Sequence, residues 1–280
     1  MAATRARRQL PGSVARHGWR CAATFASPWR WVRSAGCFLA LMCLLQAVGC
    51  ASLGRGTPAM PVVRSLQDLM PHGDRDHFVY VWQRFENGQP VADGVQVEHV
   101  TAGANGEFEV SLSENGVAVG RMLLRDLADR LVLLFEEDMV RGFRISYDPP
   151  LSQIQLPLRP GRYESSASAT FTGLADGATI GVAPVTQQVE IKPGSAVDSR
   201  VGRYAQSVVL GLVRTLRVPD GTEELRTETV VVPGIGETSS TGNTPETLQM
   251  HRELACAVIG GRRLGDCAGL DKAWKGRRTR

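Results

Sequence analysis

The residues of this sequence with a clearly defined potential chemistry are cysteines. Cys50 follows the small residues Ala47, Val48 and Gly49, which allow a chain to lie extended in a narrow processing site. A cysteine thiolate is a nucleophile, so a thiol in this setting can accept a covalently attached group. The spacing therefore predicts a cleavage and modification site at Cys50.

The segment before Cys50 differs in composition from the rest of the chain. Residues 1–49 contain seven Arg and no Asp, Glu or Lys, and an uncharged run occupies 37–45. A run of this length fits the apolar region of a signal peptide, whereas a membrane-spanning helix needs about 20 residues. We predict that residues 1–49 are a signal peptide with an apolar helix, rather than a buried helix of a folded domain. Because residues 1–31 exceed what such a peptide needs, we hypothesise a start codon assigned too far upstream.

Residues 47–50 resemble the bacterial lipobox, a Leu-(Ala/Ser)-(Gly/Ala)-Cys pattern in which only the cysteine is indispensable and from which Ala47 departs. The resemblance implies a diacylglyceryl group on the Cys50 thiol and cleavage just before it. Each buried CH₂ contributes about 0.8 kcal/mol of membrane affinity, so two or three acyl chains anchor a protein firmly. Ala51 stands where inner-membrane lipoproteins usually carry Asp. In a Gram-negative cell, this implies an outer-membrane anchor with the protein facing the periplasm.

The mature chain has three expected parts. Residues 50–70 would be the lipid anchor and a flexible tether, with a short helical turn at 66–70. Residues 71–240 alternate apolar and polar positions, as half-buried strands do. Asn-Gly steps, which favour tight hairpins, occur at 87–88, 105–106 and 115–116. We expect a mainly β fold, either an antiparallel sandwich or a curved half-barrel sheet.

Apolar residues at helical spacing occur in two segments. Residues 121–135 nearly fit helical spacing, but strand is favoured. Thr244-Pro245 is a good helix start, and Met250, Leu254, Ala257 and Val258 would share one helical face. We therefore predict a short C-terminal helix and a basic tail in residues 241–280.

Once the signal is removed and Cys50 is lipidated, two thiols are left, at Cys256 and Cys267. An oxidising periplasm makes a disulfide between them plausible, but the sequence does not give their distance. The formal net charge of +4 comes from the seven Arg of residues 1–49 and from the basic tail, because residues 50–260 are net acidic. We predict no nucleic-acid partner.

No catalytic, metal or cofactor motif is visible in the mature sequence. His72 and His77 flank Asp74 and Asp76, which could form a metal-binding loop, but a solvated loop before a strand is favoured. The adjacent pair Glu136-Glu137 would face opposite sides of a strand, and so could not share a substrate. We therefore expect no catalytic residues, no metal and no cofactor.

Two further segments carry a resemblance to a protein class. The stretch from Tyr147-Asp-Pro-Pro to Leu156-Pro-Leu-Arg-Pro-Gly161, and the later Val232-Pro-Gly-Ile-Gly236, resemble uncharacterised strand-rich domains of bacterial envelope proteins. The resemblance implies a fold and a compartment, and no activity. The leading hypothesis is a non-enzymatic, lipid-anchored envelope protein that binds an apolar ligand or a protein partner. The alternatives are an envelope hydrolase acting on cell-wall polymer and a scaffold subunit of a secretion or surface complex.

Overall fold

The computed structural model describes residues 59–218, 221–243, 249–268 and 270. These residues all belong to the second of two compact units, Arg55–Arg280. The predicted signal peptide, Cys50 and the end of the basic tail lie outside the described residues. In chain order the elements are α2 (Leu66–Leu69), β1 (His77–Glu86), β2 (Gln89–Ala102), β3 (Glu107–Glu114), β4 (Val117–Asp126), β5 (Arg130–Asp138), β6 (Phe143–Gln155), β7 (Gly161–Gly173), β8 (Thr179–Gly194), β9 (Val197–Ser199), β10 (Gly202–Tyr204), β11 (Ser207–Val218), β12 (Gly221–Val232), β13 (Gly236–Asn243), β14 (Gln249–Ile259) and β15 (Arg262–Gly265).

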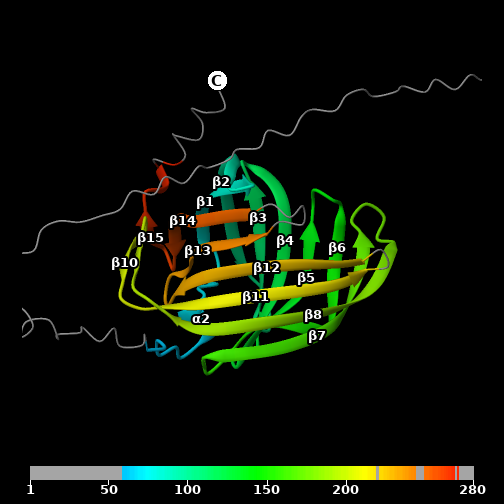
Figure 1. Cartoon of the computed structure of the whole chain (residues 1–280), viewed down its shortest axis with the longest axis horizontal. Coiled ribbons are helices and arrows are strands. Elements are labelled where there is room, and N and C mark those ends of the chain that lie inside the picture. The colour runs from blue at the N-terminus through cyan, green and yellow to red at the C-terminus, as the bar shows by residue number, and fades with distance from the viewer. Residues whose placement is uncertain (1–58, 219–220, 244–248, 269, 271–280) are drawn as a thin grey trace, which may run out of the picture. The chain divides into compact units, whose positions relative to one another are not determined.

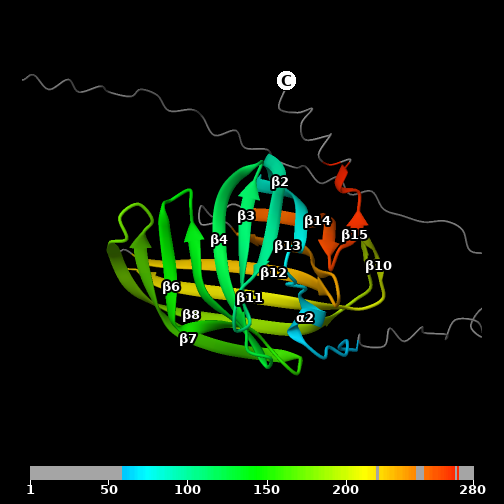
Figure 2. The same ribbon diagram turned by 180° about the vertical axis from the view of Figure 1, so that it is seen from behind.

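The strands form a closed antiparallel barrel (Figures 1 and 2). Hydrogen bonding runs from β1 through β8, continues with β11 to β14, and returns from β14 to β1, so that 12 strands close the sheet. β15 adds to β14, and β9 pairs with β10 in a separate small sheet. The mainly β prediction is confirmed. The sheet closes fully instead of forming a sandwich or half-barrel, which leaves no long unpaired edge among the twelve.

Three Asn-Gly turns build the first part of the barrel. At each of them both residues have positive φ, between 51° and 79°. This is the conformation that two-residue hairpin turns of type I′ require, and asparagine and glycine adopt it at low cost. The turns connect β1 to β2, β2 to β3 and β3 to β4, so the predicted meander is confirmed.

The predicted C-terminal helix is wrong where the structure can test it. Residues 249–259 are strand β14, residues 244–248 lie outside the described part, and the barrel therefore extends past 240. Leu254 to Ala257 are all buried, so β14 is covered on both faces. The segment around Val201 covers the outer face of β14. A bulge in its pairing with Val79 and Tyr80 interrupts the alternation of inward-facing and outward-facing side chains. The sequence pattern of a short apolar run that is buried on both faces is compatible with either a helix or a strand. Here the run forms a strand because it pairs with β1.

The two ends of the barrel differ. At one end α2 packs against the core through Leu66 and Leu69, as the predicted helical turn at 66–70 anticipated. The Gly234 amide donates to the Asp68 carbonyl there and ties α2 to the turn before β13. We call this the closed end. At the other end, which we call the mouth, lie the hairpins β1–β2, β3–β4, β5–β6 and β7–β8 (Figure 1). Among the described residues, no helix has the length and apolar character to span a bilayer.

Candidate ligand-binding site in the barrel interior

Burial of the inward-facing side chains decreases from the closed end to the mouth. Along β11, every second residue from Val208 faces the interior. Val208 and Leu210 are fully buried, whereas Leu212 and Leu216 remain partly exposed. On β4, Leu124 is likewise buried and Met122 is only partly so. Side chains therefore fill the closed end and leave the inward face accessible to solvent nearer the mouth.

A charged cluster crosses the interior at the level where burial decreases. Arg214 on β11 donates from Nη1 to both Glu136 carboxylate oxygens, at 2.9 and 3.1 Å, and to the Tyr147 hydroxyl at 3.2 Å. Its Nε donates to Gln187 Oε1 at 2.9 Å. Glu136 lies on β5, and β6, β7 and β8 separate that strand from β11 in the sheet. Arg214 therefore bridges two distant parts of the wall across the interior.

Burial and charge determine the protonation states of this cluster. Burial lowers the pKa of Arg214, but the Glu136 carboxylate and the Tyr147 hydroxyl together more than offset this effect, so the guanidinium pKa rises above its ordinary value. Burial and Glu136 together raise the pKa of the Tyr147 hydroxyl. The Arg214 side chain is only 12% exposed. Arg214 thus stays cationic and Tyr147 stays a neutral donor, so the bridge is a fixed feature of the interior.

A second cluster lies nearer the β13–β14–β1–β2 wall. Arg252 forms a two-point contact with Glu237, at 2.6 and 2.7 Å, and a further ion pair with Glu98 at 2.7 Å. Its guanidinium also stacks over the Tyr80 ring, 4.5 Å from the centroid. Two buried carboxylates therefore share one cation. Such an arrangement is stable only while each charge keeps its partner.

The shared cation makes Glu98 sensitive to pH. Burial raises the pKa of Glu98, and the Glu237 carboxylate adds to the rise, against the opposing effect of Arg252. The folded protein therefore holds this proton more tightly than the unfolded chain does, whose glutamate pKa is about 4.3. It follows that the contribution of Glu98 to stability is largest below that pH and decreases as pH rises through the folded-state pKa.

We expect Glu98→Gln to gain stability relative to the wild type as pH rises. The amide carbonyl can still accept from Arg252, while the cost of ionising a buried carboxyl is removed. Urea unfolding of both proteins at pH 4, 6 and 8 measures the difference. Parallel curves of unfolding free energy against pH would show that Glu98 does not titrate in this way.

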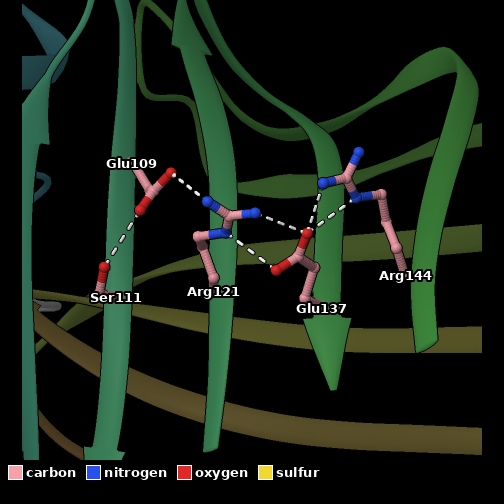
Figure 3. A network of polar contacts seen from close by, with 5 residues as sticks. All are labelled: Glu109, Ser111, Arg121, Glu137 and Arg144. Atoms are coloured by element: carbon pink, nitrogen blue, oxygen red, sulfur yellow. Dashed lines mark hydrogen bonds and ion pairs between the residues drawn. The ribbon is translucent and has the colours of Figure 1, made fainter. Parts of the chain in front are cut away.

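The outer face of β3 to β6 carries an ionic network of its own (Figure 3). Glu137, whose side chain is only 3% exposed, accepts from Arg121 at 2.7 Å and from Arg144 at 2.6 Å. Arg121 also reaches Glu109 at 3.2 Å, and Arg144 lies over the Phe135 ring, 4.4 Å from its centroid. The network links four strands side by side. It also confirms that neighbouring Glu136 and Glu137 face opposite sides, one inward and one outward.

The structure separates the histidines that the sequence suggested as a metal loop. His72 stacks on Phe108, with 4.3 Å between ring centroids, in a groove of about 540 Å³ at the closed end. His77 lies on β1, 5.5 Å from the ring of His99. The buried carboxylate of Asp76 accepts from the Gly73 and Gly260 amides. Among the described residues, no group of His, Cys, Asp or Glu is arranged to hold a metal ion.

Cys256 and Cys267 form a disulfide in the structure, with their Cα atoms 5.3 Å apart. The bond joins β14 to the residues that follow β15. Closing this short loop restricts the unfolded chain, which is the main way in which a disulfide stabilises a fold.

The arginines whose side chains point into the barrel were not identified from the sequence, although the sequence contains a signal for them. In β11 the residues Leu210, Leu212, Arg214 and Leu216 occupy alternate positions, so the arginine lies on the apolar face of the strand. Arg252 lies in the same way two residues before Leu254. A charged residue in phase with apolar positions on a strand therefore marks an inward charge.

The fold and the interior define the protein as a closed antiparallel barrel with charged bridges inside. No protein-family model and no curated protein matches the sequence. Among solved structures, the chain is similar to a protein from Bacteroides fragilis named as exported with a YmcC-like fold (TM-score 0.42, 12% identity, covering 70% of this chain and 98% of that one). It is also similar to a protein from Parabacteroides distasonis named as a lipoprotein (TM-score 0.41, 10% identity, covering 66% of this chain and 95% of that one). A third similar structure is the hypothetical lipoprotein YmcC from Escherichia coli (TM-score 0.29, 9% identity, covering 63% of this chain and 83% of that one). Two of these three proteins are named as lipoproteins and one as an exported protein; at these TM-scores the likeness carries no argument about the class or the activity of this chain.

Proposed function

We propose that the protein is a lipid-anchored, non-enzymatic envelope protein whose barrel interior binds an apolar or amphipathic ligand through the mouth. The observation that carries this proposal is the set of inward-facing apolar side chains that stay partly exposed near the mouth. They are Met122, Ile145, Phe171, Leu212 and Leu216. A well-filled interior would bury such side chains completely, because exposed apolar area opposes folding.

The Arg214 cluster provides a polar point of attachment beside these apolar walls. Within the described part of the chain, Nε and Nη1 of Arg214 have partners, and its Nη2 donates no hydrogen bond. A largely apolar site with a few fixed polar groups is the usual form of a small-molecule pocket. A ligand with an apolar body and one accepting polar group fits this arrangement.

The lipobox supports a position in the cell envelope, and Ala51 after the cysteine supports the outer membrane with the barrel facing the periplasm. Each of these locations depends on lipidation at Cys50.

The hydrolase alternative has less support from the interior. A glycoside hydrolase needs two carboxyl groups free to meet the substrate, one as acid and one as base or nucleophile. Glu98 and Glu237 are both engaged by Arg252, and Glu136 is engaged by Arg214. We therefore favour binding over catalysis.

Titration with an uncharged fluorescent apolar probe such as N-phenyl-1-naphthylamine tests the binding proposal. Leu212→Lys should weaken probe binding about tenfold or more, because a buried leucine contributes about 1.5–3 kcal/mol. Val213→Lys is the matched control, since Val213 is the next residue of β11 and faces outward beside Gln188 and Arg226. Equal probe affinity in the two variants would contradict binding inside the barrel.

A further inference from the structure

Two hairpins at the mouth expose a group of large aliphatic side chains. Met139 and Val140 lie on the β5–β6 hairpin, and Leu174, Ile180 and Val182 lie on the β7–β8 hairpin. Val140, Ile180 and Val182 are 76%, 67% and 61% exposed. We call these five residues the apolar tip. Figures 1 and 2 show both hairpins on the side of the barrel away from α2.

The two hairpins hold each other in position. The Leu174 amide donates to the Gly142 carbonyl at 2.9 Å, and Phe143 pairs with Gly173 where β6 and β7 begin their ladder. The Phe143 and Phe171 rings lie 5.7 Å apart just inside. The tip is therefore a fixed surface that continues into the apolar lining of the mouth. Exposed large apolar residues are normally scattered singly, and a cluster of them marks an interaction surface.

We propose that the apolar tip inserts into a lipid bilayer. Interfaces between proteins are rich in aromatic residues, Met and Arg at their centres, whereas four of the five side chains of the tip, all but Met139, are Val, Leu or Ile, as hydrocarbon favours. Arg141, between them, pairs with Asp138, and the loops 138–143 and 173–179 contain no lysine. The tip thus offers hydrocarbon contact without a cationic surface for anionic headgroups.

The chain before the barrel joins it at the closed end, next to α2, and its length limits how far the barrel can lie from an anchor at Cys50. Eight residues lie between Cys50 and Ala59, the first described residue, and the nine Cα–Cα steps from one to the other span at most about 30 Å when fully extended. A barrel held by a lipid at Cys50 therefore stays beside the membrane, where a tethered group has a high effective concentration. Insertion would bring the mouth to the bilayer, so an apolar ligand could pass between the two. Insertion rests on the lipid anchor of the proposed function, and the passage of a ligand rests on its ligand-binding interior as well.

Quenching by brominated lipid measures the insertion directly. The lipidated mature protein, carrying Val140→Cys labelled with bimane, is reconstituted into phosphatidylcholine vesicles with brominated acyl chains. We expect the label to be strongly quenched. Ala104→Cys is the matched control, because Ala104 is exposed in the β2–β3 turn at the closed end, and its label should keep its fluorescence. Equal quenching at the two positions, or none at either, would overturn the proposal.

A second variant separates insertion from other contacts of the tip. With the label at Ile180→Cys, adding Met139→Asp and Val140→Asp should abolish quenching and leave the thermal midpoint unchanged. Insertion should persist in 0.5 M NaCl and should not need anionic lipid; dependence on either would contradict it. Protection of the label by self-association without quenching would also overturn it. If probe binding inside the barrel persists while quenching is absent, the proposed function stands and the insertion fails.

Discussion

Replacing Arg252 with alanine should lower the free energy of unfolding by about 3–5 kcal/mol, because removing one partner leaves buried charges uncompensated. Glu98 and Glu237 would then face each other without a cation, and the stacking of Arg252 over Tyr80 would be lost as well. Small domains are stable by about 5–15 kcal/mol, so this loss is a large part of the total. Urea unfolding followed by circular dichroism at pH 7 measures it.

Two variants control this prediction. Arg130→Ala removes an arginine whose partner Asp129 is exposed, and should cost less than about 1 kcal/mol. Adding Glu98→Gln and Glu237→Gln to Arg252→Ala should restore part of the loss, since the stranded carboxylates are then neutral. If Arg252→Ala were no more damaging than Arg130→Ala, the interior cluster would not stabilise the barrel.

Replacing Cys50 with serine should abolish lipid attachment completely, because a serine hydroxyl does not replace the thiol nucleophile. Metabolic labelling with palmitate, followed by mass spectrometry of the N-terminal peptide, measures the result. Cys43→Ser is the matched control and should keep full labelling, because no small-residue cleavage pattern precedes Cys43. Label retained in Cys50→Ser, or lost in Cys43→Ser, would place the anchor elsewhere.

The hairpins of the first half of the barrel could be predicted from the sequence because their cause is local. Asn87-Gly88 and the two later Asn-Gly steps require positive φ at both positions, and few other residue pairs adopt it. The alternation in β1 and the short turn at α2 are equally local. Residues 121–135 form β4 and β5, as favoured, since Leu131 to Leu133 are buried in the sheet.

Closure of the barrel could not be predicted, because it depends on a pairing between residues far apart in sequence. β1 pairs with β14 from His77 opposite Val258 to Phe85 opposite Gln249. Nothing near either strand specifies this partner. The same pairing explains the error at 249–259, where an apolar run with helical spacing becomes a strand because its neighbours bury both of its faces.

The pairing of the charged residues across the barrel interior also could not be predicted from the sequence. Arg214 and Glu136 are recognisable as inward residues only once their strands are assigned, and their contact needs the barrel to bring β5 and β11 within reach. By contrast, the opposite orientation of Glu136 and Glu137 followed from strand geometry alone. The sequence thus allowed the faces of a strand to be predicted, but it did not specify which strands face each other.

Native mass spectrometry of the mature, lipidated protein, released from detergent micelles without organic extraction, tests the central claim of a ligand-binding interior most directly. We predict a mass above that of the polypeptide with its covalent lipid, and the excess should be lost on collisional activation or in Leu212→Lys. Repeated spectra showing only the polypeptide and its covalent lipid would contradict a ligand-binding barrel.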